Sequence, residues 1–162
     1  MTLEEWEQRF GELLADYRHR IGYGNLRAQR SEWNNSVSPI INFALVYELP
    51  GGSSSQINIE YHTADQSFRY LDADTAEECT SCDPTAVLDM LRDSISRIPA
   101  RREQRLREDI DRWFGEGKTS HEMFLEINKL LQTDFKGGSL TSQELKGGIR
   151  YIMQIGKAQV SD

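Results

Sequence analysis

Two cysteines stand in the Cys-x-x-Cys spacing of metal knuckles and redox dithiols, Cys79 and Cys82. A structural zinc site needs about four ligands, and no second Cys-x-x-Cys pair completes one; His62 would join them only if the fold brought it close. A redox dithiol of the thioredoxin type follows a buried parallel strand, whereas the strands expected here form a meander. We therefore predict an ordinary reduced pair, with no metal and no cofactor. A metal-binding or redox protein using Cys79 and Cys82 is kept as an alternative.

Two other stretches share part of the pattern of ion-binding loops. The acidic connection 72–83 has carboxylates at some EF-hand positions, but Glu77 stands where the loop needs glycine, and Asp83 replaces the final glutamate. Loose calcium binding by this connection stays open. Residues 115–119 end like a phosphate-binding loop, but Arg112 occupies the place of its first glycine. We expect a glycine-rich turn leading into a capped helix at this point.

An arginine-rich segment is unusual in a chain whose formal net charge is −7. Arg97, Arg101 and Arg105 recur every four residues, so they line one helix face and repel one another unless acids or a partner neutralise them. Arginine binds carboxylates and phosphates in a bidentate manner, which favours a docking patch for an acidic peptide or a phosphate. A solvated face with local ion pairs, for example to Glu103, is the simpler interpretation. The predicted partner-binding residues are these three arginines and Trp33, which is a core anchor or an exposed contact.

Signatures of catalysis and of membrane insertion are missing from the sequence. No Gly-x-Ser-x-Gly elbow or His-Glu-x-x-His helix occurs, and carboxylates are too numerous to nominate an acid and a base. We therefore predict no catalytic residues and no enzyme activity. The longest apolar run is only a few residues, which predicts a cytoplasmic protein without a membrane partner. The acidic charge makes general binding to nucleic acid an unfavourable interpretation.

Hydrophobic periodicity indicates the elements that position these residues. Residues 40–71 alternate apolar and polar side chains in three runs separated by turns, which is typical of an antiparallel β-meander. Residues 25–39 are polar and predict an ordered loop. Apolar residues at three- and four-residue steps predict helices over 2–21, 84–98, 100–114, 119–135 and 141–157. Thr2, Thr119 and Thr141 each precede a glutamate by three residues, the spacing of a capping box.

Two adjacent glycines interrupt the last of these helices. Gly147 and Gly148 each cost about 1 kcal/mol relative to alanine in a helix interior. A close crossing with another helix would justify that cost, although simple tolerance would also explain it.

A chain of 162 residues fits one domain with its own core, so we predict a single globular domain over 1–162. The predicted fold is α+β: an N-terminal helix, a three-stranded antiparallel meander, then three to four helices packing on one sheet face. The predicted function is a non-enzymatic adaptor, assembly chaperone or regulator that binds another cytoplasmic protein or peptide segment. An edge of the sheet or a groove of the helical hairpin could accept it. The alternatives are an immunity or antitoxin-type inhibitor of a basic enzyme, and homodimerisation.

Overall fold

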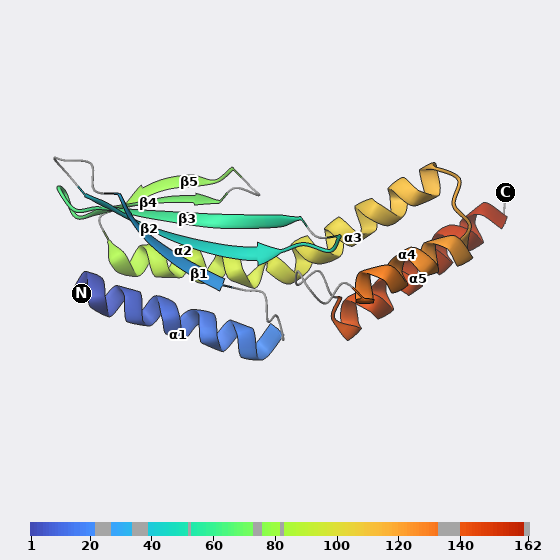
Figure 1. Cartoon of the computed structure of the whole chain (residues 1–162), viewed down its shortest axis with the longest axis horizontal. Helices are drawn as coiled ribbons and strands as arrows, with labels where there is room; N and C mark the ends of the chain where they lie inside the picture. The colour runs from blue at the N-terminus through green and yellow to red at the C-terminus, as the bar shows by residue number, and fades with distance from the viewer. Residues whose placement is uncertain are drawn as a thin grey trace. The chain divides into compact units, whose positions relative to one another are not determined.

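The computed structural model describes residues 1–21, 27–33, 39–51, 53–72, 76–81, 83–132 and 140–160 (Figure 1). The helices are α1 (Leu3–Ile21), α2 (Pro84–Ser96), α3 (Ile98–Gly115), α4 (Ser120–Gln132) and α5 (Ser142–Val160). The strands are β1 (Arg27–Trp33), β2 (Ile40–Glu48), β3 (Ser54–His62), β4 (Ser67–Asp72) and β5 (Glu78–Ser81). The fold is therefore α+β with an antiparallel sheet, as the sequence predicts.

The helices begin where the sequence signals place them. At α1, the Glu5 N–H donates to Thr2 Oγ at 3.1 Å, and the Glu5 carboxylate accepts the Thr2 N–H at 2.9 Å. At α2, the Thr85 N–H donates to the carboxylate of Asp83 at 3.0 Å. Pro99 lies in the first turn of α3, where a missing N–H removes no helical bond, so α2 ends before it.

The sheet has five strands in the order β1-β2-β3-β4-β5, and all neighbours are antiparallel. The predicted three strands are β2, β3 and β4, so the predicted strand number was too small by two. β1 lies within the loop predicted over 25–39, and β5 lies inside the predicted acidic connection 72–83. β1 is held by backbone pairing with β2, and β5 by backbone pairing with β4. Such pairing cannot be predicted from the pattern of side chains. The edge strands among the described residues are consequently β1 and β5.

The chain divides into two compact units, which are described separately. The sheet unit comprises residues 1–48 and 54–96, and the helical unit comprises residues 49–53 and 97–162. The predicted single domain stays a prediction, because compactness alone does not show which parts fold together.

In the sheet unit, α1 and α2 supply the side chains that cover one face of the sheet. Trp6 of α1 packs its ring 5.1 Å from that of Phe43 and 5.0 Å from that of Phe68, and it is fully buried. Tyr70 of β4 shares a hydrogen bond with Ser94 of α2 through their hydroxyl groups. Buried aromatic area of this kind contributes much of the stability of a small core.

In the helical unit, α3, α4 and α5 surround a core of their own. The fully or nearly buried members of this core are Leu106, Ile110, Trp113, Met123, Ile127, Leu140 and Ile152. Within the sheet unit α2 packs on the sheet, and within the helical unit α3 to α5 form a core of their own. The packing of three to four helices on one sheet face stays a prediction. The spacing of apolar residues predicts which face of each helix is buried, but it does not predict which element that face packs against.

Candidate binding groove between α3 and α5

The arginines nominated from the sequence lie on α3 and its N-cap, and they have partners within the chain. Arg97 is the N-cap residue of α3 and is exposed, while Arg101 is half-buried; both have interaction partners. Arg105 lies 3.9 Å from the carboxylate of Asp109. Burial raises the pKa of Asp109 above its ordinary value, while nearby arginines oppose that shift. The role of these three arginines in partner binding stays a prediction.

Another arginine of the same cluster has a purely internal role. Arg102 of α3 is 2% exposed, and its guanidinium donates to the Glu144 carboxylate of α5 at 2.9 and 3.2 Å. Glu144 also accepts the N–H of Thr141 at 2.9 Å and so completes the capping box of α5. A bidentate pair with this degree of burial joins the first part of α3 to the start of α5.

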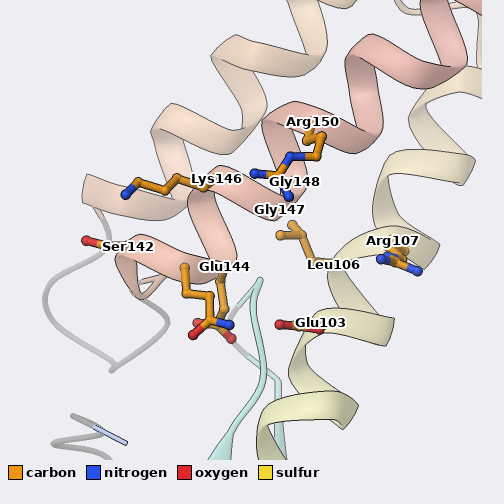
Figure 2. Close-up of a pocket in the computed structure, with 10 residues that line it drawn as sticks. Glu103, Leu106, Arg107, Ser142, Glu144, Lys146, Gly147, Gly148 and Arg150 are labelled. Atoms are coloured by element: carbon orange, nitrogen blue, oxygen red, sulfur yellow. The ribbon is translucent and has the colours of Figure 1, made fainter.

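Beside this ion pair, α3 and α5 enclose a groove of about 510 Å³ (Figure 2). From α3 it is lined by Glu103, Leu106 and Arg107. From α5 it is lined by Ser142, Gln143, Glu144, Lys146, Gly147, Gly148 and Arg150. All of these residues belong to the helical unit. In Figure 2, Glu144 of α5 and Glu103 and Leu106 of α3 lie between the two helices, while the Lys146 side chain extends away from α3.

The groove has an excess of positive charge. Arg107, Lys146 and Arg150 are exposed, and within the described part of the chain none of them forms an ion pair. Arg107 instead lies over the ring of Tyr151 at 5.4 Å. Of the two acids that line the groove, Glu144 is neutralised by Arg102, which leaves only Glu103 to oppose three cations. The groove therefore favours a negatively charged occupant.

Tyr151 holds Arg107 in place from the side of α5. Its hydroxyl donates to Asp111 at 2.6 Å, and this hydrogen bond raises the pKa of Tyr151. The ring thus has a fixed orientation under the guanidinium of Arg107. A cation held in this way loses less rotamer entropy when it binds a ligand.

The two glycines of α5 differ in what surrounds them. A Cβ on Gly148 would lie 3.0 Å from Leu106 Cδ2 and 3.2 Å from Ile127 Cδ1. Gly148 therefore permits a close crossing, which is one of the two explanations that the sequence left open. A Cβ on Gly147 would have no described atom within 4 Å. Gly147 is exposed and lines the groove, so its backbone is open to an approaching chain.

The other candidate sites predicted from the sequence lie partly outside the described residues. Cys79 is a half-buried free thiol on β5, whereas Cys82 and residues 73–75 of the acidic connection lie outside the described residues, as does the side chain of Trp33. Among the residues that are described, no three His, Cys, Asp or Glu side chains gather into a metal site. The turn after α3 leads into a helix capped by Thr119, whose Oγ accepts the Glu122 N–H at 3.2 Å, so the predicted capped turn is confirmed.

Sequence reasoning missed the groove because its cations come from two helices. Lys146 and Arg150 share the four-residue step that singled out the α3 arginines, and they flank the glycine pair. This coincidence of cations and glycines on one helix was the available signal. The partner side, Arg107 and Glu103, is 35 or more residues away in sequence and follows only from the packing of α3 on α5.

Comparisons of the chain with models of known families, with curated proteins and with solved structures found no match. Within the described residues, no helix is long and apolar enough to cross a membrane. The cytoplasmic location stays a prediction, and any functional interpretation rests on the chain's own residues.

Proposed function

We propose that this protein is a non-enzymatic adaptor or regulator whose α3–α5 groove binds a carboxylate-bearing segment of another protein. The observation that carries the proposal is the set of cations on the groove, Arg107, Lys146 and Arg150, opposed by one uncompensated acid. Charge of one sign on a concave surface favours a partner of the other sign and speeds its association.

The exposed backbone at Gly147 supports the same proposal. Glycine inside a helix costs about 1 kcal/mol, and packing explains that cost at Gly148 but not at Gly147. A chain lying in the groove would use the space that a side chain at position 147 would fill. In this proposal, Gly148 permits the close packing of α5 on its neighbours, and Gly147 leaves the groove open to the bound segment.

Binding of a labelled oligoglutamate peptide, followed by fluorescence anisotropy, tests the proposal. We expect binding that weakens with added salt, because the contacts are between exposed charges, and no comparable binding of an oligoglutamine peptide. Arg150→Glu should weaken the binding by about tenfold or more, since it both removes an attraction and adds a repulsion. Equal binding of the two peptides would contradict the proposal.

Two variants separate the groove from the general charge of the protein. Gly147→Gln fills the groove without changing the net charge, and glutamine is the better helix former, so the fold is maintained. Arg9→Glu makes the same charge change as Arg150→Glu at an exposed position on α1, outside the groove. We expect loss of binding for Gly147→Gln and retention for Arg9→Glu. The opposite pattern would place the peptide elsewhere.

A further inference from the structure

The helix α5 also borders a second groove, which is apolar. It encloses about 360 Å³ between α4 and α5, within the helical unit. Its lining is Phe124, Ile127, Asn128 and Leu131 from α4, and Leu145 and Ile149 from α5. Met153, one helical turn beyond Ile149, is 50% exposed. Exposed apolar side chains beside an apolar groove mark a binding surface.

The apolar and cationic surfaces are adjacent strips of one helix. Leu145, Ile149 and Met153 recur every four residues, and Lys146 and Arg150 each follow one of them by a single residue. Successive residues are about 100° apart around an α-helix, so the two strips run side by side along α5. A single partner segment lying along α5 would therefore meet both.

We infer that the segment bound at α5 is an acidic amphipathic helix, with apolar residues on the α4–α5 groove and carboxylates facing Lys146 and Arg150. This inference rests on the proposed function and adds the partner's conformation and its apolar anchors. A partner with carboxylates alone would leave the apolar groove in water. Apolar residues at a spacing of three and four in the partner match a groove between two helices.

The surroundings of the groove favour a helix over an extended peptide. An extended segment satisfies its backbone by adding to a sheet edge, and the described part of the helical unit contains no strand. A helix satisfies its own backbone hydrogen bonds and needs only side-chain contacts. The span from Leu145 to Met153 is roughly 12 Å, so two to three turns of a partner helix cover it.

Three synthetic peptides of about 15 residues test this inference by fluorescence anisotropy with the full chain. The first has leucines at a spacing of three and four with glutamates elsewhere; the second replaces glutamate with glutamine; the third is a scramble of the first that keeps its composition. We expect the first to bind about tenfold or more tightly than the other two, because it alone matches both strips.

Variants of the protein itself show which strip of α5, apolar or cationic, contributes to peptide binding. Met153→Gln makes an exposed side chain polar without adding charge and therefore leaves the fold intact. Ile149→Ala shortens a side chain in the groove. Both should weaken the amphipathic peptide by about tenfold and leave the scramble unchanged, whereas Arg150→Glu should weaken the amphipathic peptide and the scramble alike.

The outcomes distinguish this inference from the proposed function. Equal binding of the amphipathic peptide and its scramble, with sensitivity only to Arg150→Glu, would overturn the amphipathic helix and leave the groove proposal standing. Insensitivity of all binding to Arg150→Glu would overturn both. A concentration-dependent dimer of the protein that Met153→Gln weakens would assign the apolar groove to a second copy of the chain and overturn the inference.

Discussion

Replacing Arg102 with methionine is expected to destabilise the helical unit by about 3–5 kcal/mol. The substitution leaves the Glu144 carboxylate, whose side chain is 4% exposed, without the guanidinium that now donates to it at 2.9 and 3.2 Å. Small domains are stable by about 5–15 kcal/mol, so this loss is a large fraction of the total. The cost arises because the buried carboxylate of Glu144 loses its cationic partner, and not from the loss of apolar contact.

The double variant Arg102→Met with Glu144→Gln separates these two causes. Glutamine is uncharged, and its amide oxygen still accepts the N–H of Thr141, so the helix cap is retained. We expect the double variant to lose only about 1–2 kcal/mol, less than Arg102→Met alone. Arg107→Met provides the control, because this arginine is exposed and only lies over a ring; its loss should cost about 1 kcal/mol or less.

Urea unfolding followed by circular dichroism measures the free energy of each variant. Hydrogen exchange of the α3 and α5 amides assigns the change to the helical unit even where the two units unfold at different urea concentrations. A loss of less than about 1 kcal/mol for Arg102→Met would refute the reasoning, because the buried carboxylate of Glu144 would then not depend on the guanidinium for its stability. So would a double variant that is no more stable than Arg102→Met.

Four further outcomes are expected. Gly147→Ala should stabilise the protein by about 0.5–1 kcal/mol through helix propensity, whereas Gly148→Ala should destabilise it in urea unfolding because its Cβ meets Leu106 at 3.0 Å. Stability should fall as pH rises above the ordinary pKa of aspartate through the raised pKa of Asp109, and Asp109→Asn should remove that dependence. Glu126 should give a pH dependence of the opposite sign, because hydrogen bonds from Lys129 and Lys118 lower its pKa. Its contribution to stability is therefore present at neutral pH and lost on acidification. Thermal unfolding of Glu126→Gln across this pH range should show a smaller loss of stability on acidification than the unmodified protein. Elemental analysis should find metal far below one equivalent per chain, and a full equivalent of zinc would favour the alternative that uses Cys79 and Cys82.

The parts of the fold that were predictable are those in which side chains alone report the structure. The alternation in residues 40–71 identified β2, β3 and β4, because their inward residues such as Phe43 and Ile59 form one buried face. β1 was not predicted from the sequence, because its residues 28–32 are all exposed and no alternation of apolar and polar residues marks a buried side. It exists through backbone pairing with β2, which depends on the fold and not on the local sequence.

The same limit applied to the candidate site. A four-residue step singled out Arg97, Arg101 and Arg105, but the step does not show which arginine faces the core. Arg102 faces it, and its partner Glu144 lies 42 residues further along the chain. The glycine pair gave a hypothesis of close helix crossing, which is confirmed at Gly148.

The groove itself required tertiary packing. Each helix carries cations that are ordinary on a solvated surface, and only the crossing of α3 and α5 places three of them around one space. A composition that is acidic overall therefore concealed a local basic surface, because net charge averages over the whole molecule.

Titration of the isotope-labelled protein with oligoglutamate, followed through amide chemical shifts, tests the central claim most directly. Gly147 has no side chain, and its exposed backbone lines the groove, so its amide reports occupation of that space. We predict saturable shifts centred on Gly147, Lys146 and Arg150 that are abolished by Gly147→Gln. Shifts confined to the sheet unit, or none at peptide concentrations that give binding by anisotropy, would contradict the assignment of the groove.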